Sequence, residues 1–257
     1  MKSEVYNMDC LAFMRSLPDN AFALAIADPP YGGAGEEAVD GGGASEDGST
    51  ATSRPWSRWS CSGRQARYAP GGGRHYTFGL RKRNRGYEDR RNMGREIRKK
   101  IIAWDTAPDE EFFKELRRVS RNQIIWGANY FPNMPPTRCF VVWRKLTISE
   151  NFSMAMAEYA WTSFNGNAKV YECAPQGKPG DERFHPTQKP VALYSWLIRH
   201  FWQGGAIFDP MMGSQSSRIA AHIAGADFVG CELDPDYFAK GNARFEAATR
   251  QLLLPLA

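Results

Sequence analysis

The residues best suited to chemistry are Asp28-Pro29-Pro30-Tyr31, which directly follow the apolar run Phe22–Ala27. The run predicts a buried strand, and the prolines predict a turn at its end. Such a turn presents a carboxylate, an aromatic ring, and a carbonyl on a proline that has no N–H to compete. Asp28 and Pro29 could accept from both hydrogens of a ring-bound amine, which frees its lone pair, while Tyr31 stacks on the ring. An ordinary strand-ending turn is the alternative interpretation.

A second group of candidate residues lies near the C-terminus, where the run Ala206–Phe208 leads into Asp209-Pro210-Met211-Met212-Gly213-Ser214. A helix is predicted over 216–224 and a strand over 227–231, and Glu232 follows that strand. This layout is typical of a nucleotide-binding crossover, in which small residues let the backbone approach the ligand. A carboxylate placed like Glu232 can accept from both ribose hydroxyls. An ordinary βαβ turn is the alternative here.

Two further motifs are the pair Asp9-Cys10 and the hexapeptide His185-Pro186-Thr187-Gln188-Lys189-Pro190. Taken together, the four motifs resemble those of the DNA amino-methyltransferases, which move a methyl group from S-adenosylmethionine to adenine N6 or cytosine N4. Their order, with Asp-Pro-Pro-Tyr first and the cofactor motif last, is similar to the β group. The resemblance implies an α/β, Rossmann-like methyltransferase fold with a mainly parallel, doubly wound sheet, here as a single domain over 1–257.

The resemblance also implies a role for each motif. The pair at the N-terminus would meet the cofactor adenine, although Asp9 is equally suited to cap a helix. The hexapeptide would line the methionine end, where Thr187 and Lys189 could bind the carboxylate. The implied catalytic residues are Asp28, Pro29, Pro30 and Tyr31, and the implied cofactor-binding residues are Asp9, Cys10, His185, Thr187, Lys189, Asp209, Pro210, Gly213, Ser214 and Glu232.

One position departs from the family pattern, because Gln215 stands where the family has a glycine. If that glycine needs a positive φ or a close approach to the cofactor, the glutamine causes strain or blocks the site. Asp-Pro-Pro-Tyr goes mainly with adenine in this family and Ser-Pro-Pro with cytosine N4, so adenine N6 of a flipped base is the predicted target. The alternatives are cytosine N4 and a DNA-binding protein that has lost transfer activity at the Gln215 loop.

The charge distribution predicts a nucleic-acid partner. Residues 54–100 hold 15 of the 33 basic side chains and only three of the 28 acidic ones, with aromatic residues interspersed. Guanidinium groups bind phosphates and aromatic rings stack on bases, so we expect residues 32–100 to be a flexible, basic-aromatic insertion that binds double-stranded DNA. A solvated basic loop is the alternative. The predicted DNA-binding residues are Arg54, Arg58, Arg64, Arg67, Arg74, Arg81, Lys82, Arg83 and Arg85.

The rest of the sequence limits the remaining classes. The five cysteines are scattered without a Cys-x-x-Cys pair, which predicts a reducing compartment and no metal site. No apolar run is long enough to span a membrane, so we expect a cytoplasmic, nucleoid-associated protein. A homodimer and a cognate restriction endonuclease are open as further partners. Helices are also predicted over 10–17, 109–119, 190–202 and from 234, and strands over 123–126, 140–143 and 154–161.

Overall fold

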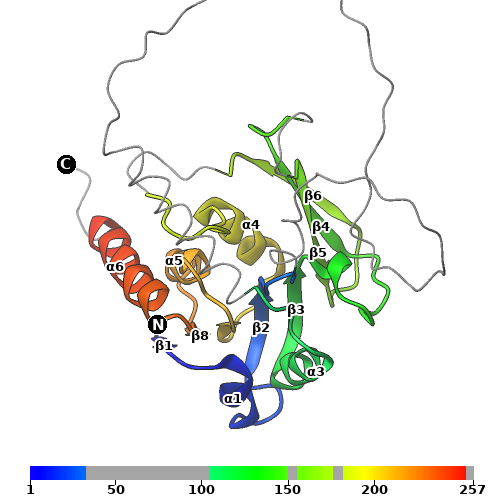
Figure 1. Cartoon of the computed structure of the whole chain (residues 1–257), viewed down its shortest axis with the longest axis horizontal. Coiled ribbons are helices and arrows are strands. Elements are labelled where there is room, and N and C mark those ends of the chain that lie inside the picture. The colour runs from blue at the N-terminus through cyan, green and yellow to red at the C-terminus, as the bar shows by residue number, and fades with distance from the viewer. Residues whose placement is uncertain (33–104, 150–154, 176–181, 253–257) are drawn as a thin grey trace, which may run out of the picture. The chain divides into compact units, whose positions relative to one another are not determined.

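The computed structural model describes residues 1–32, 105–149, 155–175 and 182–252. The described strands form a sheet in the order β1-β8-β7-β2-β3-β5-β4-β6 (Figure 1). The strands are β1 (Ser3–Tyr6), β2 (Phe22–Ala27), β3 (Ser120–Trp126), β4 (Phe140–Lys145), β5 (Ala157–Thr162), β6 (Lys169–Cys173), β7 (Ile207–Asp209) and β8 (Phe228–Cys231). The helices are α1 (Cys10–Arg15), α3 (Glu110–Val119), the short 3-10 turn η1 (Ala128–Tyr130), α4 (Val191–Phe201), α5 (Ser216–Ile223) and α6 (Pro235–Leu252).

The sheet consists of a parallel part and a mixed part. The strands β1, β8, β7, β2 and β3 run parallel to their neighbours, whereas β5 is antiparallel to both β3 and β4. The predicted α/β class with a mainly parallel sheet is therefore confirmed. Strand β6 was not predicted, because its sequence Lys-Val-Tyr-Glu-Cys is half polar and pairs only at the edge of the sheet, parallel to β4.

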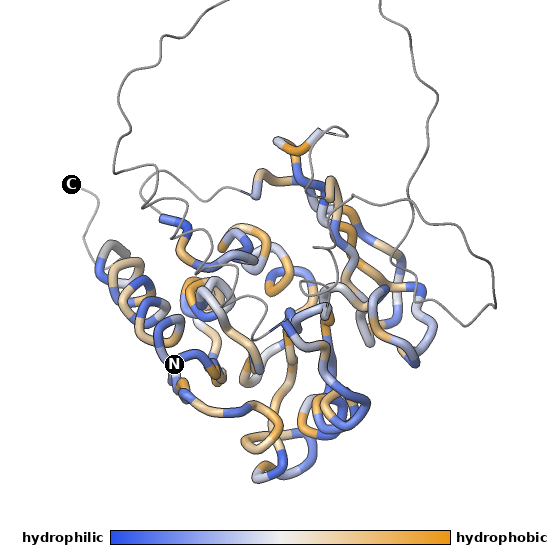
Figure 2. The backbone as a smooth tube through the Cα atoms, in the orientation of Figure 1, coloured by the Kyte–Doolittle hydropathy of each residue, from blue (hydrophilic) through white to orange (hydrophobic). Residues whose placement is uncertain are grey.

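Helices cover both faces of the sheet, because side chains of each buried strand point alternately to opposite faces. Leu24 and Ile26 of β2 pack in the cluster that contains α4 and α5. Ala25 and Ala27 pack in the other cluster, with α1 and α3. Helix α6 likewise carries both hydrophilic and hydrophobic residues along its length (Figure 2). The layers are those of a doubly wound fold.

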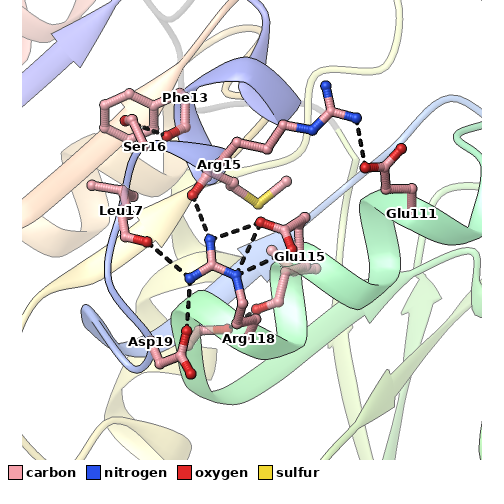
Figure 3. A network of polar contacts seen from close by, with 11 residues as sticks. Phe13, Arg15, Ser16, Leu17, Asp19, Glu111, Glu115 and Arg118 are labelled. Atoms are coloured by element: carbon pink, nitrogen blue, oxygen red, sulfur yellow. Dashed lines mark hydrogen bonds and ion pairs between the residues drawn. The ribbon is translucent and has the colours of Figure 1, made fainter.

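Arg118 at the end of α3 holds the turn between α1 and β2 in place (Figure 3). Its guanidinium donates to the carbonyl oxygens of Met14 and Leu17, each at 2.8 Å, and to Asp19 Oδ1 at 2.8 Å. Glu115 of α3 accepts from the same group at 2.7 Å. Because β2 carries Asp28 at its far end, this clamp fixes the strand on which the candidate catalytic turn is built.

Two sequence predictions fall on residues without a described position. The insertion over 32–100, apart from Gly32, and with it every predicted DNA-binding side chain, lies outside the described residues. Those side chains therefore stay predictions. None of the described helices is both long and apolar enough to cross a membrane.

Candidate active site

Three of the four motifs, all except the hexapeptide at 185–190, lie at one edge of the sheet. Strands β1, β8, β7 and β2 are adjacent and parallel, and they are followed by Asp9, Glu232, the loop after Asp209, and Asp28 in that spatial order. The carboxyl ends of parallel strands lie at the same edge, so motifs far apart in the sequence form a row. Asn7, just beyond β1, donates to the carbonyl oxygen of Glu232 at 2.7 Å and links the first two positions of the row.

The candidate catalytic turn after β2 has a carboxylate that is hydrogen-bonded on both oxygens. The Tyr31 hydroxyl donates to Asp28 Oδ1 at 3.1 Å, and Lys189 Nζ donates to Oδ2 at 2.5 Å. Burial raises the pKa of Asp28, and the Lys189 ammonium opposes that rise. Burial beside Asp28 also raises the pKa of Tyr31, so its hydroxyl stays protonated and serves as a donor. A carboxylate has about four acceptor positions, which leaves about two for a further donor.

The Tyr31 ring is fixed by two neighbours that the structure reveals. Its face stacks on Tyr130 of η1 with centroids 4.8 Å apart, and its edge lies against Gly127. Gly127 has φ +63°, and a Cβ there would lie 2.0 Å from Tyr31 Cε1. Tyr130 is 59% exposed, so this aromatic pair opens to solvent next to Asp28.

Gly127→Ala is expected to lower the activity of this site by about 10²-fold, because it displaces the Tyr31 ring by roughly an ångström or more. Gly225→Ala is the matched control: Gly225 has φ +71°, but a Cβ there meets nothing within 4 Å. Both variants carry the same left-handed strain, about 1–2 kcal/mol. Single-turnover rates and melting temperatures of the two variants separate the effects. Equal loss of activity in both would show that the contact with Tyr31 is irrelevant.

Lys189 belongs to a buried group of charges that was not predicted as a unit. Its ammonium lies 2.5 Å from Asp28 Oδ2 and 3.1 Å from Glu158 Oε2, and Glu158 Oε1 lies 2.6 Å from Lys145 Nζ. The Lys189 side chain is 4% exposed and that of Lys145 is 5% exposed. These contacts place the Lys189 ammonium beside Asp28 of the candidate catalytic turn, and binding of a cofactor carboxylate by Lys189 stays a prediction. No sequence motif marked Glu158 or Lys145.

The loop between β7 and α5 approaches the edge of the sheet through Gly213. This glycine has φ +48°, and a Cβ there would lie 3.1 Å from the His185 ring, which therefore packs against the loop. The Gly213 N–H donates to Glu232 Oε2 at 2.7 Å, and the Asp234 N–H donates to Oε1 at 2.9 Å. Burial raises the pKa of Glu232 and lowers that of His185 to about 4, so the imidazole is neutral at pH 7.

Gln215 has φ +60°, a left-handed conformation that favours glycine. The backbone strain expected at this position is therefore present. Its side chain is fully buried against α6 instead of standing free in the loop. Gln215 Nε2 donates to Asn242 Oδ1 at 3.1 Å, and Arg218 Nη1 donates to Gln215 Oε1 at 2.8 Å. A Cβ at Gly241 would lie 2.7 Å from the glutamine side chain, so Gly241 provides its space. Helix α6 thus accommodates the substitution.

The other predicted residues lie near the same edge of the sheet, most of them buried or hydrogen-bonded within the protein. Asp209 is buried, and it accepts from the Ser217 hydroxyl and from the Met211 N–H at 3.0 Å; burial raises its pKa to about 7. Asp9 accepts from the Ala12 N–H at 2.8 Å, which confirms the helix cap. Cys10, Pro210 and Ser214 are buried, and Thr187 is exposed beside His185. Among the described residues, no cluster of potential metal ligands is present.

Comparisons with known proteins point to DNA methylases. Residues 136–243 match a family model described as DNA methylase, N6_N4_Mtase. Over 96% of this chain and 83% of the relative, the sequence is 26% identical to the type II methyltransferase M.ScaI of Streptomyces caespitosus. These similarities support an amino-methyltransferase of the N6-adenine/N4-cytosine family. The cofactor of such enzymes is S-adenosylmethionine.

Other matches are more local or show the fold alone. The DNA adenine methyltransferase YhdJ of Escherichia coli (strain K12) is 35% identical over 66 residues, which is 25% of this chain and 22% of YhdJ. Another curated match spans 34% of its relative. The solved structure of the PvuII DNA methyltransferase (cytosine-N4-specific) has a TM-score of 0.52 and 12% identity over 97% of this chain and 91% of that chain. That likeness shows the fold, and the fold class is confirmed.

The residues of the site fit the cofactor. Gly213 provides a cradle that a Cβ would narrow against His185, and Glu232 has acceptor capacity beyond its two backbone N–H partners. Arg244 of α6 also holds this loop, donating to the Ser214 carbonyl oxygen at 2.7 Å and to Ser216 Oγ at 2.8 Å. Sequence reasoning missed Arg244, because a lone arginine in a helix carries no signal of a contact so far away in the chain.

Proposed function

We propose that this protein methylates adenine N6 in double-stranded DNA. The observation that carries the proposal is the row of motifs along four adjacent parallel strands, with Asp28 at one end and Asp9 at the other. The row offers positions for the cofactor adenine at β1, its ribose at β8, its methionine part at β7 and the target base at β2. The Asp-Pro-Pro-Tyr motif and the local similarity to the adenine methyltransferase YhdJ favour adenine over cytosine.

The residues of the catalytic turn would act on the target amine. The Asp28 carboxylate and the Pro29 carbonyl oxygen accept from the two N–H groups, so the nitrogen lone pair points away from the ring. Tyr31 packs against the base, which must leave the duplex to reach this turn. S-adenosylmethionine supplies an activated methyl group when bound. Transfer then depends mainly on alignment, for which precise positioning by the protein supplies much of the rate.

The cofactor would be held by the residues of the other three strand ends. Glu232 accepts from the ribose hydroxyls, the backbone of Gly213 and Ser214 approaches the cofactor, and Asp9 with Cys10 borders its adenine. The segment that holds His185, Thr187 and Lys189 is attached to this loop, since Ser216 Oγ donates to the Lys189 carbonyl oxygen at 2.7 Å. Asp209 and Pro210 shape the start of the loop as buried residues.

Mass spectrometry of nucleosides from DNA incubated with the protein and S-adenosylmethionine tests the proposal. N6-methyladenine is the expected product. N4-methylcytosine would keep the mechanism and overturn the choice of base. DNA binding without a methylated base would favour the alternative of a DNA-binding protein that has lost transfer activity at the Gln215 loop. The accommodation of Gln215 by α6 argues against this outcome.

The basic insertion is proposed to bind the DNA backbone. The insertion variant replaces four basic residues with glutamine, namely Arg81, Lys82, Arg83 and Arg85. The negative slope of log K against log salt concentration should become shallower by about 0.9 for each phosphate that the variant no longer neutralises. Fluorescence anisotropy with a duplex at several salt concentrations measures the slope. The matched control replaces Arg15, Arg121, Arg144 and Arg250, which lie elsewhere on the chain. An equal slope for parent and insertion variant would exclude this segment from the interface.

A further inference from the structure

Two carboxylates and two ammonium groups alternate in one chain behind the catalytic turn, in which the lysines are buried and the carboxylates are half-buried. The order is Asp28, Lys189, Glu158 and Lys145, with successive separations of 2.5, 3.1 and 2.6 Å. The four residues come from different parts of the fold. Glu158 lies in β5, Lys145 ends β4 and Lys189 precedes α4. With all four groups ionised, the chain has no net charge, which is the condition under which buried charges are tolerated.

Two indole rings form an apolar boundary around the ammonium groups. Lys189 Nζ lies 5.4 Å from the centroid of the Trp126 ring, and Lys145 Nζ lies 5.1 Å from that of Trp143. The two tryptophans pack edge to face with centroids 6.3 Å apart. Low polarity around the charges strengthens their mutual attraction and makes an unpaired charge costly. The position of each group therefore depends on its neighbours in the chain.

From this geometry we propose that Glu158, backed by Lys145, is a positioning residue that holds part of the Lys189 ammonium, so that Lys189 keeps Asp28 ionised without filling the acceptor positions that the target amine needs. The inference rests on the proposed methyl transfer. A protonated Asp28 would have one acceptor position fewer and would present a donor to the amine. A lysine bound to Asp28 alone would occupy that carboxylate more completely. The presence of Lys189 avoids the first outcome, and the division of its ammonium between Asp28 and Glu158 avoids the second.

Several groups face Asp28 and act on its charge. Tyr31 donates to it from the same turn, Lys189 contacts it from the segment before α4, and Glu158 faces it from β5. Tyr194 of α4 and Asp209 of β7 lie close enough for electrostatic interaction. Burial raises the pKa of Asp28, Lys189 lowers it, and Glu158 raises it. Removing the lysine or the glutamate should therefore shift the ionisation of Asp28 in opposite directions.

Single-turnover methylation rates across pH, with cofactor and DNA both saturating, test the inference. The acid limb of this profile should move to higher pH by about 1 to 3 units in Lys189→Met, since removing an opposite charge at this distance has that effect. In Glu158→Gln the acid limb should move to lower pH, because one anion near Asp28 is removed while the lysine remains. The cofactor Kd should stay that of the parent in Glu158→Gln.

A matched control and a combined variant make the test specific. Glu172→Gln removes a carboxylate from the exposed ion pair with Arg144, 2.7 Å apart on the same sheet, and should leave the profile unchanged. Lys189→Met with Glu158→Gln should give an acid limb between those of the two single variants. If Lys189→Met does not fold, Glu158→Gln carries the test alone, because it keeps the shape and the lysine.

The outcomes separate the inference from the proposed function. A parent protein without methylation activity would overturn the proposed function. An active parent, together with variants that lose rate equally at every pH, would overturn the inference and leave the function standing. Movement of both acid limbs in the same direction would also overturn it, as would a weakened cofactor affinity in Lys189→Met, which would place the ammonium at the cofactor carboxylate.

Discussion

Asp28→Asn is expected to lower the single-turnover rate of methyl transfer by about 10²- to 10³-fold, a loss typical of removing one preorganised electrostatic group. The substitution keeps the shape of the side chain and an oxygen for the Tyr31 hydroxyl. It removes the negative charge and replaces one acceptor oxygen with an N–H donor, which faces the target amine or Lys189. The amine then loses one of the two acceptors that free its lone pair. Cofactor affinity should be unchanged, because Asp28 lies at the other end of the site.

Asparagine is a better choice than alanine at this position. Lys189 would retain Glu158 as a partner in either variant, but alanine also leaves a cavity beside a buried ammonium. Breaking a buried ion pair costs about 3–5 kcal/mol, so Asp28→Ala confounds lost chemistry with lost stability. Asp227→Asn is the matched control, because Asp227 is exposed at the opposite end of a parallel strand, where it contacts the N-terminus. Retention of the parent rate in Asp28→Asn would remove Asp28 from the catalytic assignment.

The elements and strand ends of the site were predictable from short patterns. The run Phe22–Ala27 and the run Ala206–Phe208 both became adjacent strands, and each polar motif stands directly after its strand. Hydrophobic periodicity identifies strands, and alternation with helices predicts a parallel sheet. The resemblance to a known family added the order of the motifs. Local information was sufficient here because each motif is attached to its own strand.

The contacts between motifs were not predictable in the same way. Lys189 and Asp28 are 161 positions apart, and the direction of a lysine side chain in a loop depends on what surrounds it. Glu158 is part of a strand that was predicted, but the antiparallel insertion of β5 between β3 and β4 decides that it faces Lys189. Gln215 is a further example, since Gly241 of α6 provides space that no pattern near Gln215 reveals. Such contacts are tertiary, and single-sequence patterns do not contain them.

Glu232→Ala is expected to weaken cofactor binding by about 10- to 100-fold, equivalent to about 1.5–3 kcal/mol for hydrogen bonds to a charged group. The carboxylate has two tasks, because it holds the Gly213 N–H at 2.7 Å and is the proposed acceptor for the ribose hydroxyls. Loss of the first task loosens the loop, and loss of the second removes direct hydrogen bonds to the cofactor. Isothermal titration calorimetry with S-adenosylmethionine measures the effect.

Dependence on pH distinguishes the charge of Glu232 from its shape. Burial raises the pKa of this carboxyl. Only its ionised form can accept from the two backbone N–H groups and from both ribose hydroxyls at once. Cofactor affinity of the parent should therefore be greatest at neutral pH and should fall as the pH decreases, beginning at a higher pH than an ordinary glutamate would require. Glu232→Gln should bind more weakly at neutral pH and show no such fall. Glu246→Gln, on the exposed side of α6, should follow the parent curve. If the affinity of the parent were as independent of pH as that of Glu232→Gln, the ionised carboxylate would not be what recognises the ribose.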